Sequence, residues 1–183
     1  EKKNIKGAEL SKKTLGIVGF GNVGVRLSNL VKGFDMKILV NSKSLESRKN
    51  EYPHVTNTSF DDLISTSDII SFHCKAAADG KPLLTKDHFK KMKPTSYIVN
   101  AARGNIIDEN DLNDALNEGL IAGAAVDVFS KEPTKENILF NNPKAVLTPH
   151  IAASTTEASI VVAEMVANQI SDFLLKGVKK NTV

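Results

Sequence analysis

The stretch that decides the fold is Thr14–Gly24, which reads TLGIVGFGNVG. Its first part, Thr14–Val18, is a short run of mostly apolar residues, which is typical of a buried parallel β-strand. A GxGxxG pattern follows over Gly19–Gly24, and apolar residues at helical spacing continue to about Gly33. The stretch therefore predicts a strand, a tight glycine turn and a helix in immediate succession.

The three glycines of this turn, Gly19, Gly21 and Gly24, suit a tight turn, close approach of the backbone to a pyrophosphate, and close helix–strand packing. The free backbone N–H groups of Asn22 and Val23 at the helix start would face the phosphates, whose charge the helix dipole favours. A glycine triplet alone is a weak signal, because a plain turn in a non-binding α/β protein has the same pattern. A triplet between a strand and a helix favours a dinucleotide-binding site.

The rest of the chain alternates short apolar runs with longer amphipathic segments. We predict further strands at residues 36–40, 68–72, 97–100, 122–128 and 145–148. We predict helices that open after Ser59, that run over 108–117 before Gly119, and that run over 155–175 before Gly177. This alternation favours parallel strands joined by right-handed crossovers. The expected fold class is α/β, a Rossmann-type doubly wound parallel sheet in one three-layer dinucleotide-binding domain over residues 1–183.

Composition excludes several other classes of protein. A net charge of +3, with the lysines spread along 183 residues, argues against a nucleic-acid partner. The single cysteine, Cys74, fits a reducing, cytoplasmic location, and the four histidines lack the spacing of metal ligands. We expect no membrane partner, because no apolar run approaches the roughly 18 residues of a membrane span. The start is polar and Lys-rich, unlike a signal peptide, and begins at Glu1, so we expect a piece of a longer protein.

The acid that usually binds the ribose, about twenty residues after the glycines, is absent. The second strand ends Asn41-Ser42-Lys43, which places Ser42 where an Asp is usual. Either Asn41 and Ser42 bind the NAD ribose through neutral hydrogen bonds, or Lys43 attracts the 2′-phosphate of NADP. The cofactor is therefore expected to be NAD, with NADP possible.

Three polar residues, Arg103, Glu132 and His150, follow three successive predicted strands. The carboxyl ends of such strands are where α/β sheets place ligands. An imidazole can take a hydroxyl proton, a guanidinium can grip a carboxylate, and a carboxylate can orient the imidazole and raise its pKa. Singly, the three also fit an ion pair at a helix cap, a surface acid and a loop histidine. Together they predict a site for hydride transfer.

Four segments carry a resemblance to a known family. They are residues 14–21, 100–104, 127–129 and 148–151. Their order and spacing resemble the D-isomer-specific 2-hydroxyacid dehydrogenases across essentially the whole chain. Residues 153–158 and 172–177 resemble the branch of that family that oxidises D-3-phosphoglycerate.

The resemblance implies roles for individual residues. It implies that Arg103 binds the carboxylate and carbonyl oxygen of the substrate, that Glu132 pairs with His150, and that His150 is the acid/base. It also implies that Asp127 lies near the nicotinamide amide. One departure is that Cys74 and Lys75 stand where the family usually has a proline. The full set of expected cofactor-binding residues is Gly19, Gly21, Asn22, Val23, Gly24, Ser42, Lys43, Cys74, Ala101, Ala102, Arg103, Asp127, His150, Ala152 and Ala153.

The resemblance also implies a larger, homodimeric enzyme whose substrate domain lies on both sides of this chain. We therefore expect the chain to fold and bind cofactor but to turn over a 2-hydroxy acid or 2-oxo acid very poorly. One alternative is a hydroxypyruvate or glyoxylate reductase, which the altered ribose position favours. Another is a cofactor-sensing binding module, like the corepressors of the same fold. The Arg-Glu-His set favours an enzyme over such a module.

Overall fold

The computed structural model describes residues 7–180, and the chain divides after Pro149 into two compact units. The strands of the first unit are β1 (Thr14–Val18), β2 (Lys37–Asn41), β3 (Thr56–Asn57), β4 (Ile69–Phe72), β5 (Tyr97–Asn100), β6 (Gly123–Val126) and β7 (Ala145–Leu147). Its α-helices are α1 (Asn22–Leu30), α2 (Phe60–Thr66), α3 (Lys86–Phe89) and α4 (Glu109–Glu118). Its 3-10 segments are η2 (Val31–Phe34), η3 (Lys43–Glu51), η4 (Gly104–Ile106) and η5 (Ile138–Asn141). The second unit contains α5 (Thr156–Lys176).

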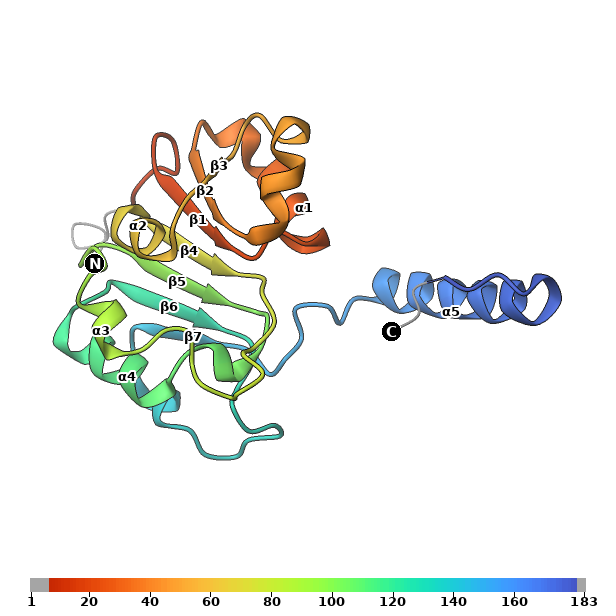
Figure 1. Ribbon diagram of the computed structural model, residues 1–183. Helices are drawn as coiled ribbons and strands as arrows, with labels where there is room; N and C mark the ends of the chain where they lie inside the picture. Colours follow the sequence, from red (N-terminus) through yellow and green to blue (C-terminus); the bar gives the residue numbers. More distant parts are fainter. Residues whose placement is uncertain (1–6, 181–183) are drawn as a thin grey trace. The chain divides into compact units, whose positions relative to one another are not determined.

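The first unit is built on a seven-stranded sheet of order β3-β2-β1-β4-β5-β6-β7, in which every pair is parallel. The arrows of Figure 1 all run the same way, so the carboxyl ends of the strands share one edge. The strand order reverses beside β1, which pairs with β2 on one side and β4 on the other. Such a reversal is the usual ligand site of an open α/β sheet. The predicted α/β Rossmann-type fold is confirmed.

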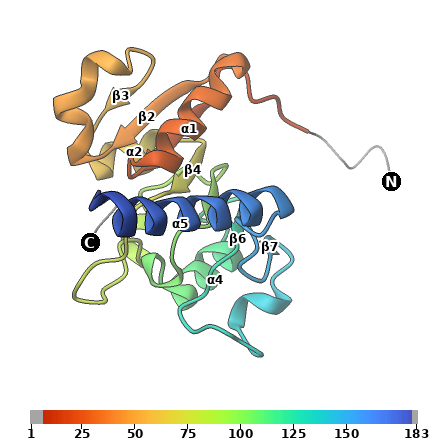
Figure 2. The ribbon, with the colours of Figure 1, turned by 90° about the vertical axis from the view of Figure 1, so that its right-hand side faces the viewer.

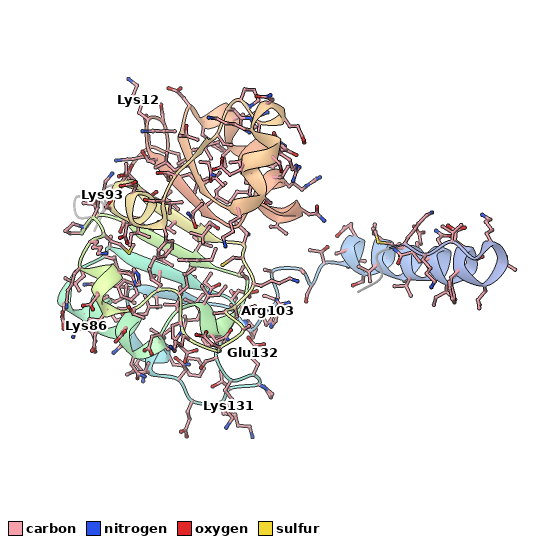
Figure 3. The ribbon with its side chains drawn as sticks, viewed as in Figure 1. Lys12, Lys86, Lys93, Arg103, Lys131 and Glu132 are labelled. Atoms are coloured by element: carbon pink, nitrogen blue, oxygen red, sulfur yellow. The ribbon has the colours of Figure 1, made fainter. Side chains whose placement is uncertain are left out.

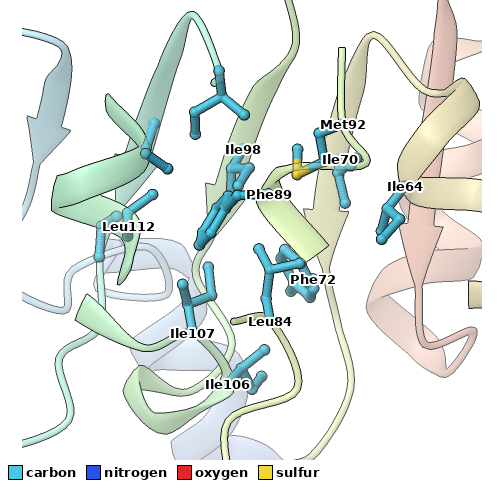
Figure 4. Packing of buried hydrophobic residues seen from close by; sticks show 14 of the residues in the cluster. Ile64, Ile70, Phe72, Leu84, Phe89, Met92, Ile98, Ile106, Ile107 and Leu112 are labelled. Carbon is cyan, nitrogen blue, oxygen red and sulfur yellow. The ribbon is translucent and has the colours of Figure 1, made fainter. Parts of the chain in front are cut away.

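Alternate residues of each strand point to opposite faces of the sheet, and each face has its own core. On one face α2, α3 and α4 cover the larger cluster, which includes the fully buried Leu84, Phe89 and Ile98 (Figure 4). On the other face α1, η2 and η3 pack over β1 and β2, where Ile17 and Val40 are fully buried. Both faces of β1 and β2 are therefore covered, as the continuous apolar runs in the sequence predicted.

The helical layer that α1, η2 and η3 form does not extend over β5 and β7 within the first unit. Tyr97 on β5 is 53% exposed, and Val146 on β7 is 68% exposed. Ile98, the chain neighbour of Tyr97, points to the opposite face and is fully buried. In this half of the sheet, one face thus packs against the larger core cluster, and the other face is largely solvent-accessible within the first unit.

Local signals in the sequence placed several helix ends correctly. The Ser59 hydroxyl caps α2 by accepting from the Asp62 N–H, and the Asp108 carboxylate caps α4 in the same way. Gly119 and Gly177 end α4 and α5 in the left-handed conformation that glycine adopts without strain. The elements η3, β3 and α3 were not predicted, because their residues show no clear helical or strand periodicity.

Helix α5 overturns one expectation about composition. It is a single uninterrupted helix of 21 residues (Figure 2), and a stretch of 18 residues within it has a mean hydropathy of 1.3, so the helix is long and apolar enough to cross a membrane. The expectation that no apolar run approaches the length of a membrane span is therefore wrong, as judged by the length and composition of α5. One such helix is weak evidence for a span, since core helices of soluble proteins pass the same test. The expected absence of a membrane partner stays a prediction. The Lys-rich start of the chain lies outside the described residues.

Candidate cofactor site

The glycine turn has the close contacts that its pattern predicts. Gly19 has a φ of +93°, and a Cβ there would lie 2.6 Å from the His73 carbonyl oxygen. A Cβ on Gly24 would overlap the Gly19 carbonyl, so α1 can approach the turn only because Gly24 has no side chain. Gly21, by contrast, has open space where its Cβ would be. That space fits a pyrophosphate, which needs close access to the backbone.

The start of α1 is available to an anion. Gly21 is its N-cap residue and supplies no side-chain hydrogen bond to the first turn. Asn22 and Val23 are exposed, and no acidic residue occupies this turn. The backbone N–H groups and the helix dipole therefore favour negative charge at this point. The residues present fit the diphosphate of a dinucleotide.

A cleft of about 610 Å³ lies between this helix start and the loops that follow β4 and β5. It is lined by Val23, His73, Cys74, Lys75, Ala76, Ala101, Ala102, Arg103 and Asn105. The structure thus brings together five of the predicted site residues, namely Val23, Cys74, Ala101, Ala102 and Arg103. Sequence reasoning missed His73, Ala76 and Asn105, although each lies within a few residues of a predicted strand end.

Arg103 stands on a loop that the end of β5 holds in place. The Asn100 side chain, 1% exposed, donates from Nδ2 to the Arg103 carbonyl at 3.0 Å. Its Oδ1 accepts from the Ala102 N–H at 3.1 Å. Gly104 continues the loop against the backbone of Phe129, where a Cβ would overlap the carbonyl group. The guanidinium itself is exposed and hydrogen-bonds only the Ala102 carbonyl in the described structure, which leaves most of its donors available to a ligand.

Two neutral side chains line the cleft beside the glycine turn. Burial lowers the pKa of His73, and its Nε2 lies 2.9 Å from the Ser71 hydroxyl. Burial also raises the pKa of the Cys74 thiol. Near neutral pH the cleft therefore gains no charge from these two residues. The charges nearest the cleft are those of Lys75 and Arg103, both of which line it.

Glu132 and Asp127 lie beyond the carboxyl end of β6. The Glu132 carboxylate accepts from the Phe129 N–H at 2.7 Å, and the Asp127 carboxylate accepts from the Thr148 hydroxyl at 2.5 Å. In Figure 3 Arg103 and Glu132 both lie at the edge of the sheet where the strands end. His150, with a φ of +55°, opens the second unit, which also contains Ala152 and Ala153. The pairing of Glu132 with His150 stays a prediction.

A second pocket, of about 410 Å³, lies at the carboxyl end of β2. It is lined by Asn41, Ser42, Lys43, Glu46, Asn57, Thr58 and Ser59. The sequence identified the first three as ribose-binding candidates and missed the other four, because only the fold brings η3 and the β3–α2 loop beside Ser42. Within residues 7–180, no group of three or more His, Cys, Asp or Glu side chains is arranged to hold a metal ion.

The parallel sheet, the open glycine turn and the two pockets along the strand ends define a dinucleotide-binding domain of the Rossmann type. Residues 1–152 match the family described as D-isomer specific 2-hydroxyacid dehydrogenase, NAD binding domain. The chain belongs to this family, whose members are oxidoreductases, and it is an NAD-binding domain.

Relatives within the family differ in substrate. D-3-phosphoglycerate dehydrogenase of Synechocystis sp. (strain ATCC 27184 / PCC 6803 / Kazusa) is 39% identical over 96% of this chain and 32% of its own length. Glyoxylate reductase of Thermococcus litoralis is 38% identical over 97% of this chain and 54% of its own length. The solved structure of D-2-hydroxyisocaproate dehydrogenase matches with a TM-score of 0.89 at 28% identity, over 98% of this chain and 58% of its own. The chain thus spans about a third to just over half the length of these relatives.

Proposed function

We propose that the intact enzyme interconverts a D-2-hydroxy acid and its 2-oxo acid with NAD, and that its substrate is D-3-phosphoglycerate, a step of serine biosynthesis. The observation that carries the proposal is the position of Arg103. This residue lines the cofactor cleft on a loop that Asn100 holds rigidly, with most of its donors available. A guanidinium held in that way suits bidentate recognition of a carboxylate beside the cofactor.

The proposed mechanism assigns one task to each side chain. When bound, the nicotinamide supplies the hydride acceptor or donor. Arg103 binds the substrate carboxylate and stabilises charge on the reacting oxygen. His150 takes the hydroxyl proton in oxidation and returns it in reduction. Glu132, whose carboxylate already accepts from the Phe129 N–H, orients the imidazole.

Glyoxylate reduction is the second candidate function. A glyoxylate reductase is as similar in sequence to this chain as a phosphoglycerate dehydrogenase is, at 38% against 39% identity. The two activities differ in whether the substrate carries a phosphate, which the residues of this chain are not expected to bind. A panel of phosphoglycerate, hydroxypyruvate and glyoxylate, assayed on the intact enzyme, separates them. Faster turnover of glyoxylate than of phosphoglycerate would favour the second candidate.

We also propose that the intact enzyme is a cytoplasmic homodimer. The cytoplasmic location is supported by Cys74, which is a free thiol. The homodimer follows from resemblance to the family. Sedimentation of the intact enzyme and its distribution on cell fractionation test the two parts separately.

The catalytic roles are tested by His150→Ala and Arg103→Ala in the intact enzyme. We expect turnover to fall by about 10²–10⁴-fold for the loss of an acid/base group, with the Kd for NADH little changed. Arg48→Ala is the control, because Arg48 pairs with Glu51 outside both pockets and should leave turnover unchanged. Near-normal turnover in either catalytic variant would show that its assigned role is wrong.

A further inference from the structure

The pocket at the end of β2 adjoins the glycine turn. The Gly19 N–H donates to the Asn41 carbonyl at 3.0 Å, and the Ser44 hydroxyl donates to the Phe20 carbonyl at 3.5 Å. In a Rossmann domain the residues at the end of the second strand contact the ribose 2′ position. The charge of this pocket therefore decides between the 2′-hydroxyl of NAD and the 2′-phosphate of NADP.

Glu46 brings a carboxylate into this pocket from η3. The Asn57 amide Nδ2 donates to Glu46 Oε1, and Asn57 Oδ1 accepts from the Ser42 N–H at 3.3 Å. The same side chain thus tethers both Glu46 and the backbone of Ser42, the residue at the position of the missing acid. Among the described residues, nothing donates a hydrogen bond to Glu46 Oε2. That oxygen is available to a hydroxyl group.

Lys43 is the opposing charge in the pocket, and it is held differently. Both Lys43 and Glu46 are exposed, but in the described part of the chain Lys43 forms no ion pair or side-chain hydrogen bond. A long exposed lysine must lose conformational freedom before it binds a phosphate, whereas Glu46 is already positioned by Asn57. The charge that a side-chain hydrogen bond holds at this pocket is therefore negative.

We propose that Glu46 selects NAD over NADP by supplying the carboxylate that Ser42 lacks. The ribose hydroxyls of NAD can donate to Glu46, a charge-assisted hydrogen bond. The 2′-phosphate of NADP would meet a carboxylate of the same sign at this pocket. This inference rests on the NAD-binding site described above, and it adds the residue that decides between the two nicotinamide cofactors.

The test is to titrate the purified 183-residue chain and its Glu46→Gln variant with NADH and NADPH at low salt, following nicotinamide fluorescence. We expect the original chain to bind NADH more tightly. Glutamine has nearly the same size as glutamate but no charge, so the variant should bind NADPH more tightly and NADH more weakly. The ratio of the two Kd values should shift toward NADPH by about tenfold or more, the usual effect of a hydrogen bond to a charged group.

Glu51→Gln is the matched control. Glu51 lies on the same segment, η3, but it pairs with Arg48 at 3.3 Å and does not line the pocket. Its substitution changes the net charge by the same amount, so an effect of general electrostatics would appear in both variants. Added salt should reduce the preference of the original chain for NADH over NADPH, because salt screens the repulsion between Glu46 and the 2′-phosphate. The same salt should have less effect on the Glu46→Gln variant.

Each outcome is decisive. An unchanged ratio in Glu46→Gln, or an equal shift in Glu51→Gln, would overturn the role of Glu46. Tighter binding of NADPH by the original chain, lost in Lys43→Gln, would overturn it in favour of Lys43. Failure of the folded original chain to bind either cofactor would instead contradict the NAD-binding site itself. Circular dichroism of each protein distinguishes that last result from misfolding.

Discussion

Single side chains join elements of this fold that lie far apart in the sequence, and Asp68 is an example. Its carboxylate accepts from the Thr14 N–H at 2.8 Å and from the Lys93 ammonium at 2.9 Å. Burial alone would raise the pKa of Asp68, but the hydrogen bonds from Thr14 and Lys93 outweigh it and hold the pKa below its usual value. The ionised carboxylate is therefore more stable in the folded protein than in the unfolded chain.

We expect Asp68→Ala to lower the free energy of unfolding at pH 7 by about 1–3 kcal/mol, the usual range for a hydrogen bond to a charged group. Because the folded pKa is depressed, this contribution is fully present above the unfolded pKa of about 3.9 and is lost as pH falls through the folded value. Urea unfolding at pH 7 and near pH 3 measures both effects. Asp79→Ala, at an exposed carboxylate 3.8 Å from Lys81, should have little effect at either pH.

The hydrogen bonds of Asn100 show how one residue can position a binding site without contacting a ligand. Asn100 is buried at the end of β5 and fixes both the Ala102 N–H and the Arg103 carbonyl. An arginine on an exposed loop would otherwise lose much conformational freedom when it binds a substrate. The asparagine therefore reduces the entropy that binding costs.

At the scale of elements, the contact between the β5 loop and the β6 loop depends on Gly104. A Cβ on this residue would overlap the Phe129 carbonyl carbon, so the two loops can meet only at a glycine. We expect Gly104→Ala to cost about 1–3 kcal/mol of stability, the usual effect of overpacking, and to displace Arg103. Thermal unfolding measures the loss of stability, and turnover by the intact enzyme measures the displacement of Arg103.

Gly33→Ala is the control for that substitution, because Gly33 has open space around its Cβ position and no positive φ. The same added methyl group should leave stability unchanged or slightly higher there. Equal costs at Gly33 and Gly104 would contradict the proposed contact between the two loops.

The two faces of the sheet give another prediction at this scale. Ile98 is fully buried on one face, whereas Val146 is 68% exposed on the other. We expect Ile98→Ala to cost about 2–5 kcal/mol and Val146→Ala to stay within about 0.5 kcal/mol, as surface substitutions do. Denaturant unfolding of the two variants measures the difference. A large cost at Val146 would mean that this face is covered in solution.

At the scale of the whole molecule, the chain covers 32% of the Synechocystis relative and 54% of the Thermococcus relative. An enzyme that transfers hydride closes around its substrate and excludes water. Such closure needs protein on both sides of the cleft. We therefore expect this chain to bind NADH but to turn over phosphoglycerate or glyoxylate only at a trace rate.

Nicotinamide fluorescence measures the binding, and absorbance at the nicotinamide band measures the turnover. Robust substrate-dependent oxidation or reduction of the cofactor by the purified chain would contradict this prediction. The His150→Ala variant of the same chain serves as the control for contaminating activity, since its own turnover should be about 10²–10⁴-fold lower.

Much of the fold followed from local patterns. The TLGIVGFGNVG stretch contains its own strand, turn and helix, and residues such as Ser59, Asp108 and Gly119 end helices through groups within a few positions of themselves. The site was harder to predict. Arg103 stood out because a charged residue follows a buried strand, but His73 and Asn105 have no pattern of their own. Their place in the cleft comes from strand ends that meet at one edge of the sheet.

By itself, the sequence determined the class of this protein: a parallel α/β domain with a glycine turn for a dinucleotide, and an Arg, a Glu and a His after successive strands. These features are local or periodic, so neighbouring residues suffice to specify them. Only the tertiary structure decided which side chains share a pocket. Ser42 appeared to leave the ribose without a carboxylate until the fold placed Glu46 and Asn57 beside it. The reason is that crossover connections bring the ends of separate strands to one edge, and linear spacing carries no record of those contacts.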